Sequence, residues 1–275
     1  MRRPAKRSLS QNFLVDPNLQ RKIVEELGAG PADTVLEIGP GYGELSRHLV
    51  GRVARLVLVE KDATLAAQLA ERWGGRDDVR VHEGDALALD LHDLLAWGRP
   101  FRILSNVPYH ITSPLLFAFL ALRPPAARIV VTVQKEVAER IVAPSGSRAY
   151  GALSVGVQSV ADATLAFPVG RKTFRPVPEV DSAVVRIVPD PRRVERVDPA
   201  ALRRVTRALF GRRRKQLQKI LRSAPELAAA VRDPDAVCER LGVDPRARPE
   251  TLEPDVFVRL AEWTALGGNA GGATG

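Results

Sequence analysis

Glycine and acidic residues with the chemistry to hold a nucleoside follow three predicted β-strands directly. The motif EIGPGYG (37–43) places glycines at Gly39 and Gly41, where the backbone can turn sharply and approach a ligand closely. Glu60 ends the next predicted strand, where a carboxylate can accept hydrogen bonds from both hydroxyls of a ribose. Asp85 follows the third strand and could accept from the exocyclic amine of an adenine. Each feature alone also fits a tight turn or a solvated strand end. Together they indicate an adenosine-bearing cofactor, either a nicotinamide dinucleotide or S-adenosylmethionine.

A fourth group, NVPY (106–109), follows the fourth predicted strand and could act on a base. The side-chain oxygen of Asn106 and the backbone carbonyl of Val107 could both accept hydrogen bonds from one exocyclic amine. Pro108 stiffens the turn, and the ring of Tyr109 offers a face on which a base can stack. Two acceptors on the protons of an adenine amine favour a tetrahedral nitrogen, whose lone pair can attack a methyl group. The same four residues could instead form a β-turn with a buried tyrosine.

These groups need a sheet that brings them to one edge, and the chain has the pattern of such a sheet. Short β-branched segments predict strands at 34–38, 55–59, 79–83, 101–105 and 128–133. Helices are expected at 17–27, 43–50, 62–73 and 112–122. A pair of strands is expected at 163–167 and 182–188. The alternation of strands and helices predicts an α/β, Rossmann-like domain, with a parallel sheet covered on both faces.

The pattern changes near residue 192, after a segment rich in proline and charge. Only helices are predicted beyond it, at 199–210, 213–222, 225–232, 234–241 and 254–266. We therefore predict a cofactor-binding catalytic domain over 1–191 and a small all-α domain over 192–266. The glycine-rich residues 267–275 are expected to be a disordered tail.

The chain is basic, and its positive charge is unevenly distributed. Its 275 residues include 41 Lys and Arg against 32 Asp and Glu, a formal net charge of +9. Residues 171–222 hold sixteen basic and five acidic residues, and residues 1–22 hold six and one. Crowded cations repel one another unless an anion neutralises them, so we expect phosphate contacts from one late cluster, although a solvated face is the alternative. The cluster consists of Arg212, Arg213, Arg214, Lys215, Lys219 and Arg222, and the first five are the residues to which we assign the contacts with a polyanion.

Other features narrow the class of protein. The single cysteine, Cys238, excludes an internal disulfide framework, and the four histidines have no metal-ligand spacing, so no metal site is expected. The basic N-terminus is followed by polar residues instead of an apolar segment, which argues against a signal peptide. No apolar stretch reaches the roughly 18 residues of a membrane span. We expect a cytoplasmic protein, a monomer, with no membrane partner.

Six segments strongly resemble the ribosomal RNA adenine dimethyltransferases, and within that family the bacterial small-subunit type. They are QNFLVDP (11–17), VLEIGPGYGELS (35–46), EGDAL (83–87), SNVPYHITSPLL (105–116), QKEVAERIVAPSGSRAYGALSV (134–155) and FRPVPEVDSAVV (174–185). The resemblance continues through LFGRRRKQLQKIL (209–221) and LGVDPRARPETL (241–252), so it covers about residues 8–266. Where relatives commonly have NLPY, this chain has Val107 in place of Leu.

The resemblance implies S-adenosylmethionine as the cofactor and assigns roles to particular residues. The cofactor site it implies consists of Asn12, Leu14, Gly39, Gly41, Glu60, Lys61, Asp85, Ala86 and Asn106. The catalytic residues it implies are Asn106, Pro108, Tyr109 and Phe174, with Phe174 in a loop near the target base. The implied reaction is dimethylation of the exocyclic amines of two adjacent adenosines near the 3′ end of small-subunit (16S) rRNA. The implied partner is that rRNA within the 30S precursor particle.

Two alternatives remain at this stage. The first is the related large-subunit rRNA methyltransferase that confers macrolide resistance, which shares the Gly-rich and NxPY motifs; the GRRRK (211–215) and RPETL (248–252) segments argue against it. The second is a non-catalytic RNA-binding assembly factor. The intact Gly-rich motif, Glu60, Asp85 and NVPY argue against a decayed site.

Overall fold

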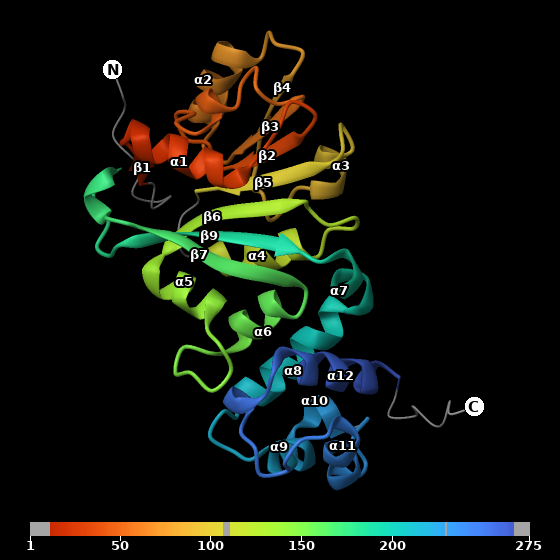
Figure 1. The fold of residues 1–275 in the computed structure, drawn as a ribbon. Coiled ribbons are helices and arrows are strands. Elements are labelled where there is room, and N and C mark those ends of the chain that lie inside the picture. Colours follow the sequence, from red (N-terminus) through yellow and green to blue (C-terminus); the bar gives the residue numbers. More distant parts are fainter. Residues whose placement is uncertain (1–11, 107–110, 229, 267–275) are drawn as a thin grey trace. The chain divides into compact units, whose positions relative to one another are not determined.

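The fold follows from a computed structural model that describes residues 12–106, 111–228 and 230–266 (Figure 1). The chain divides into two compact units. The first comprises the described residues up to Ala138 together with Asp162–Pro189. The second comprises Glu139–Ala161 and the described residues from Asp190 onward.

A seven-stranded sheet forms the centre of the first unit, with the strand order β4-β3-β2-β5-β6-β9-β7. Its strands are β2 (Thr34–Ile38), β3 (Arg55–Glu60), β4 (Val79–Glu83), β5 (Phe101–Ser105), β6 (Arg128–Gln134), β7 (Ala161–Val169) and β9 (Ser182–Pro189). The pairs β4–β3, β3–β2, β2–β5 and β5–β6 are parallel, whereas β6–β9 is antiparallel. Every residue of β2 is buried, as expected for a central strand covered on both faces. The predicted α/β fold is thus confirmed.

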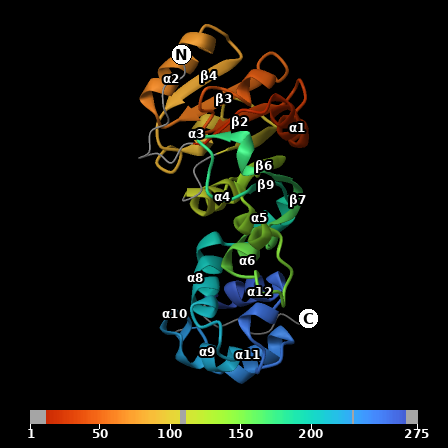
Figure 2. The same ribbon diagram turned by 90° about the vertical axis from the view of Figure 1, so that its left-hand side faces the viewer.

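Helices cover this sheet on both sides. The first unit contains α1 (Pro17–Leu27), α2 (Ala63–Trp73), α3 (Leu91–Leu95) and α4 (Thr112–Leu120), and α5 (Lys135–Val142) leads out of it. Helices α1 and α4 lie on opposite faces (Figure 2). Helix α1 begins as its sequence predicts, because the side chain of Asp16 accepts hydrogen bonds from the N–H groups of Asn18 and Leu19 and Pro17 needs no donor partner.

A short two-stranded sheet joins two distant parts of the first unit. Strand β1 (Phe13–Leu14) pairs antiparallel with β8 (Phe174–Arg175), so that Leu14 lies opposite Phe174. The N–H of Val15 extends the pairing by donating to the carbonyl of Thr173 at 2.8 Å. Thr173 ends the 3₁₀ turn η4 (Arg171–Thr173).

The predicted helix at 43–50 is not formed as an α-helix. Turns follow the Gly-rich motif, and only the 3₁₀ helix η2 (Ser46–His48) appears in this stretch. Gly43 has a φ of 79°, a left-handed conformation that cannot continue into a right-handed helix. The carbonyl of Gly43 still accepts from the N–H of Arg47 at 3.1 Å, but the segment continues as turns and η2.

The second unit is helical among its described residues. It contains α6 (Ala152–Gln158), α7 (Pro191–Arg196), α8 (Pro199–Phe210), α9 (Leu217–Ser223), α10 (Pro225–Ala228), α11 (Pro234–Leu241), the 3₁₀ turn η5 (Pro249–Thr251) and α12 (Pro254–Ala265). Asp-Pro pairs cap α7, α8 and α11 in the same way as α1. Helix α9 starts at Leu217, four residues later than expected, because residues 211–214 form a turn.

Residues 139–161 pack with this helical unit, which differs from the predicted boundary at residue 191. The reason is a set of contacts to α8 and α12. The ring of fully buried Tyr150 lies 6.0 Å from that of Phe210, which stacks on Phe257 at 5.4 Å. The hydroxyl of Tyr150 also donates to the carbonyl of Leu252 at 2.8 Å. The second unit is therefore built from two separate stretches of chain.

Candidate functional site

The parallel strands align the predicted site residues at one edge of the sheet. Ile38, the last residue of β2, is the register partner of both Val59 in β3 and Ser105 in β5. The residues that follow these three positions are Gly39, Glu60 and Asn106. Ligands of open α/β sheets bind at this carboxyl edge. The structure thus brings together three groups that lie far apart in the sequence.

Gly39, Gly41 and Gly43 of the Gly-rich turn all have left-handed φ values, and at the last two a side chain would also meet an aromatic ring. Gly41 and Gly43 have φ values of 62° and 79°, in the left-handed region. A Cβ on Gly41 would lie 3.0 Å from the ring of Phe13, and one on Gly43 would lie 2.4 Å from the ring of Trp73. The rings of Phe13 and Trp73 already fill the space beside Gly41 and Gly43. A residue with a side chain at either position would therefore force the turn to change shape. Such a turn leaves bare backbone for a ligand to approach.

Glu60 holds this turn and keeps capacity for a ligand. Its residue is only 4% exposed, and its two carboxylate oxygens accept from the N–H groups of Gly41 at 3.0 Å and Asp62 at 2.9 Å. Burial raises the pKa of Glu60, and these two hydrogen bonds oppose that effect. A carboxylate offers about four lone-pair sites, so each oxygen can accept one more donor. This arrangement fits the two hydroxyls of a ribose.

Asp85 is an ionised acceptor at the end of β4. One oxygen lies 2.7 Å from Nζ of Lys61, and the other accepts from the N–H of Leu87 at 3.0 Å. The hydrogen bond from Lys61 holds the pKa of Asp85 below its usual range. The Lys61–Asp85 pair is exposed, so its contribution to stability is small. Ala86 beside it is buried. The carboxylate is therefore poised to accept from a further donor such as a purine amine.

The N-terminal segment lies over the Gly-rich turn. The rings of Phe13 and Tyr42 are tilted against one another, with their centroids 4.7 Å apart. Leu14 is buried, and its carbonyl accepts a hydrogen bond of 2.7 Å from Nε2 of Gln20. Asn12, which precedes this strand, is partly buried. Three of the residues predicted to hold the cofactor, Leu14, Gly41 and Glu60, thus belong to one connected set of contacts.

The structure places Phe174 in the hydrophobic core of the first unit. Its side chain is 1% exposed and belongs to the same hydrophobic cluster as Leu14. The predicted place of Phe174 near the target base stays a prediction. The exposed apolar residues of the following loop are Val177 and Val180. The apolar ring of Phe174 gains more free energy by burial than it would in an open loop. Its contribution to the site is through the pairing of β8 with β1.

The proposed base-binding motif is only partly covered by the described residues. Asn106 directly follows β5 and is partly buried. Val107–His110 lie outside the described residues, so the predicted roles of Pro108 and Tyr109 remain predictions.

Glu37, on β2 below the turn, is a buried acid that our motif analysis gave no role. It is 2% exposed, and the hydroxyl of Ser46 donates to it at 2.7 Å. Burial raises the pKa of Glu37 to about 8, and the nearby charges of Glu44 and Glu60 add to this effect. Glu37 therefore carries a proton at neutral pH. The sequence feature that could have pointed to Glu37 is a glutamate within a central strand that is otherwise uncharged.

The basic segment of the second unit divides into two kinds of side chain. Arg212 lies 3.5 Å from Glu226 and Arg213 lies 3.6 Å from Glu250, and both arginines are partly buried. In contrast, the exposed cations between residues 212 and 219 that have no carboxylate partner among the described residues are Arg214, Lys215 and Lys219. The sequence alone could not separate these two sets, because the carboxylates come from later helices and turns.

A comparison with known protein families shows the family to which the chain belongs. The family described as "Ribosomal RNA adenine dimethylase" matches residues 2–265. The chain belongs to the ribosomal RNA adenine dimethylase family. This confirms the resemblance drawn from the sequence motifs.

Curated members of this family match the chain over nearly its full length. The chain is 43% identical to the ribosomal RNA small subunit methyltransferase A of Nitratidesulfovibrio vulgaris strain Hildenborough, over 95% of the chain and 97% of that protein. It is 40% identical to the protein of the same name from Geobacter metallireducens, over 96% and 97%.

Solved structures of adenine dimethylases and related enzymes share the fold. A dimethyladenosine transferase from Plasmodium falciparum superposes with a TM-score of 0.76 at 26% identity, covering 90% of this chain and 95% of that one. The 23S rRNA methyltransferase ErmE superposes with a TM-score of 0.64 at 26% identity, covering 92% and 99%. The predicted combination of a Rossmann-like methyltransferase sheet with an added helical part is confirmed.

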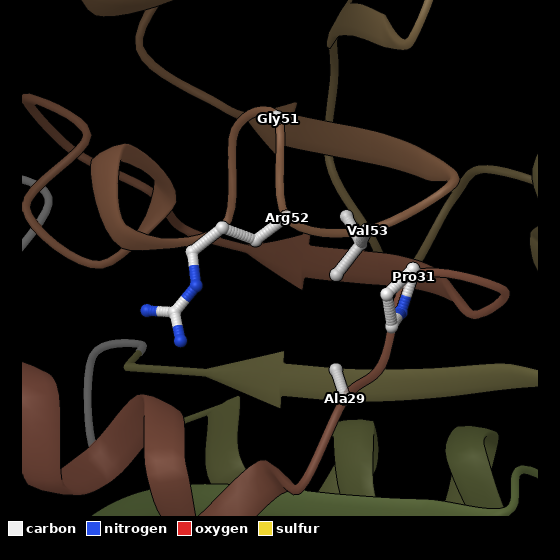
Figure 3. Close-up of a pocket in the computed structure, with 5 residues that line it drawn as sticks. All are labelled: Ala29, Pro31, Gly51, Arg52 and Val53. Carbon is white, nitrogen blue, oxygen red and sulfur yellow. The ribbon is translucent and has the colours of Figure 1, made fainter.

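One hollow of the first unit lies away from the proposed methyltransferase site. A hollow of about 440 Å³ is lined by Ala29, Pro31, Gly51, Arg52 and Val53 (Figure 3). These residues precede β2 and β3, so the hollow lies at the end of the sheet opposite to Gly39 and Glu60.

Within the described ranges we find no group of three potential metal ligands, and no helix there is long and apolar enough to span a bilayer.

Proposed function

We propose that this chain uses S-adenosylmethionine to dimethylate the exocyclic amines of two adjacent adenosines near the 3′ end of small-subunit rRNA. The observation that carries the proposal is the alignment of Gly39, Glu60 and Asn106 at one sheet edge, in a chain whose family is the rRNA adenine dimethylases. The full-length similarity to proteins named small subunit methyltransferase A supports the choice of subunit.

The cofactor is held by groups that the first unit places together. Glu60 accepts hydrogen bonds from the ribose hydroxyls, and Asp85 accepts from the adenine amine of the cofactor. The backbone at Gly39 and Gly41 lies against the cofactor, and Asn12, Leu14, Lys61 and Ala86 complete the surrounding wall. Bound S-adenosylmethionine supplies an electrophilic methyl group on a positively charged sulfur.

The target amine is oriented by the residues after β5. The side-chain oxygen of Asn106 and the carbonyl of Val107 accept hydrogen bonds from its two protons, which directs its lone pair away from the ring. Pro108 fixes the turn, and Tyr109 stacks on the target base. The adenine must leave its own stack to reach these groups, which costs least in an unpaired loop. As the N–C bond forms and the S–C bond breaks, the sulfur would leave as a neutral thioether and the methylated amine would carry the positive charge. That amine is acidic enough to release one proton to water, so no strong side-chain base is needed.

The second unit supplies contacts to the rRNA phosphates. Arg214, Lys215 and Lys219 are exposed and have no carboxylate partner among the described residues, so phosphate groups can neutralise them. We propose that the substrate particle is a precursor of the 30S subunit, that the enzyme acts as a monomer, and that it does so in the cytoplasm where this particle is assembled.

One assay tests the reaction and its substrate together. Purified protein is incubated with S-adenosylmethionine carrying a labelled methyl group and with small subunits that lack the modification, and the labelled nucleotides are mapped. We expect dimethyladenosine at two adjacent positions near the 3′ end. Label on large-subunit rRNA instead would support the macrolide-resistance activity. Absence of label from both, with binding to the particle retained, would support a non-catalytic assembly factor.

A further inference from the structure

The solvent-facing side of helix α8 consists of arginines. Between Ala200 and Gly211 every exposed position is an arginine, namely Arg203, Arg204 and Arg207. The opposite side packs into the second unit through buried residues that include Leu202, Val205 and Leu209. We refer to the three arginines as the α8 arginine face.

These three guanidinium groups have no partner within the described part of the chain. None of them has a hydrogen bond or an ion pair there. Other arginines of the same unit do have partners: Arg196 is held by Asp255 and Glu262, and Arg222 lies 2.8 Å from Asp235. Carboxylates are therefore available in this unit, and they pair with arginines elsewhere.

The sequence around α8 leaves its charge uncompensated. From Pro199 to Arg222 the chain has nine Lys and Arg and no Asp or Glu. Like charges three or four residues apart on a helix repel, and Arg207 is so placed relative to both Arg203 and Arg204. The helix dipole favours a cation in the last turn, which accounts for Arg207 but not for Arg203 or Arg204. Neither local pairing nor the dipole explains this face.

We infer that the α8 arginine face binds phosphate groups of the rRNA, as a contact additional to Arg214, Lys215 and Lys219. This inference rests on the proposed function, since it supposes an rRNA substrate. A polyanion is the partner that compensates an exposed helix face made of cations only. Side chains that bind phosphates in this way position the RNA without reading its sequence.

The test compares variants that change the same amount of charge. In the first, Arg203→Gln, Arg204→Gln and Arg207→Gln are combined. In the control, Arg196→Gln, Arg222→Gln and Arg259→Gln remove three arginines of the same unit that have carboxylate partners. A third variant, which combines Arg203→Lys, Arg204→Lys and Arg207→Lys, keeps the charge. Binding to unmethylated small subunits is measured over a range of salt concentrations, after thermal melts establish that each variant is folded.

We expect the Gln variant of α8 to flatten the slope of log affinity against log salt by up to about two units, since each phosphate contact contributes about 0.7 to 0.9. At about 0.1 M salt this corresponds to a loss of affinity of about a hundredfold. The Lys variant and the paired-arginine control should keep the wild-type slope. A wild-type slope in the Gln variant, or an equal flattening in the control, would overturn the inference.

A photo-crosslinking residue in place of Arg203 identifies the class of partner. An adduct with rRNA is expected, whereas an adduct with a ribosomal protein would overturn the inference. The proposed function is tested separately by methyl transfer from the wild-type protein. If the wild type methylates small subunits while the Gln variant keeps its salt slope, only the inference about α8 fails.

Discussion

The side-chain amide of Gln20 connects strand β1 to the segment after the Gly-rich turn, because its Nε2 donates to the carbonyl of Leu14 at 2.7 Å. Its Oε1 accepts from the guanidinium of Arg47, in η2 after the Gly-rich turn. Gln20 is 1% exposed, and its hydrogen bond to the Leu14 carbonyl is buried. The strand that carries Leu14 is thereby fixed to the segment that follows the turn.

Replacing Gln20 with Met should weaken cofactor binding without slowing the chemistry. The variant keeps the buried volume but leaves the Leu14 carbonyl without its donor, at a cost of about 1 kcal/mol. We expect KM for S-adenosylmethionine to rise about fivefold while kcat at saturation stays unchanged. The matched control is Gln158→Met, since Nε2 of Gln158 also donates to backbone carbonyls, those of Ile141 and Ala143 in the second unit. Equal KM values in the two variants would contradict a positioning role for Gln20.

Glu60→Ala should weaken S-adenosylmethionine binding by about 1.5–3 kcal/mol, the range for hydrogen bonds to a charged group. The substitution removes the acceptor for the ribose and also releases the N–H of Gly41. Calorimetry on the folded variant measures the change directly. Unchanged affinity would remove Glu60 from the ribose site.

Asn106→Ala should slow methyl transfer by at least about tenfold, equivalent to about 1.4 kcal/mol of barrier, with rRNA binding nearly intact. The reason is that Asn106 is assigned to hold the target amine at the moment of attack. Single-turnover rates at saturating cofactor and substrate isolate this step. A wild-type rate would exclude the proposed orientation of the amine.

Glu37→Gln should change how stability depends on pH. The native pKa of Glu37 is raised to about 8, so between about pH 4.5 and 8 the folded protein binds more protons than the unfolded chain. The contribution of Glu37 to the free energy of unfolding of the wild type is therefore largest at low pH. It decreases as pH rises, by up to about 1.4 kcal/mol per pH unit. The variant is neutral at every pH, and its side-chain oxygen can still accept from Ser46.

We expect the Glu37→Gln variant to be more stable than the wild type near pH 8, with the difference shrinking toward about pH 5. Urea unfolding of both proteins at several pH values measures the difference, in which the contributions of other titrating groups cancel. A constant difference across this range would mean that Glu37 is ionised in the folded protein.

The basic segment should divide into RNA-binding and structural arginines. Arg214→Gln combined with Lys215→Gln should flatten the salt slope of rRNA binding by about 1.5 units, as for two lost phosphate contacts. Arg212→Gln combined with Arg213→Gln changes the same charge but removes the ion pairs with Glu226 and Glu250, so it should mainly lower the melting temperature. Cofactor affinity should stay at the wild-type value in both. The reverse pattern would assign the phosphate contacts to the paired arginines.

The sequence predicts the sheet and the position of its ligand edge well, because both depend on local patterns. Strand ends are marked by the change from β-branched residues to Gly39, Glu60 and Asp85. Several helix starts are marked by an aspartate followed by a proline, as in α1, α7, α8 and α11. These signals act over a few residues, and the parallel register then aligns the strand ends.

The features that the sequence does not predict depend on contacts between distant residues. Gln20 has no motif, and its role follows from the position of Arg47. Phe174 lies within a Pro-rich segment typical of a loop, yet it pairs with Leu14 and is buried in the core. The helix predicted at 43–50 is prevented by the left-handed Gly43. Each of these features depends on tertiary packing, which cannot be predicted from the periodicity of apolar residues.

The order of the two units along the chain has a consequence for making fragments of this protein. Because Tyr150 donates to Leu252 and its ring packs near Phe210, residues 139–161 need the C-terminal helices to cover them. A fragment that ends near residue 190 would expose this tyrosine and the apolar residues around it, and one that starts there would lack part of its own core. During synthesis, residues 139–161 likewise leave the ribosome before the helices that bury them, so their apolar side chains stay uncovered until those helices have been made.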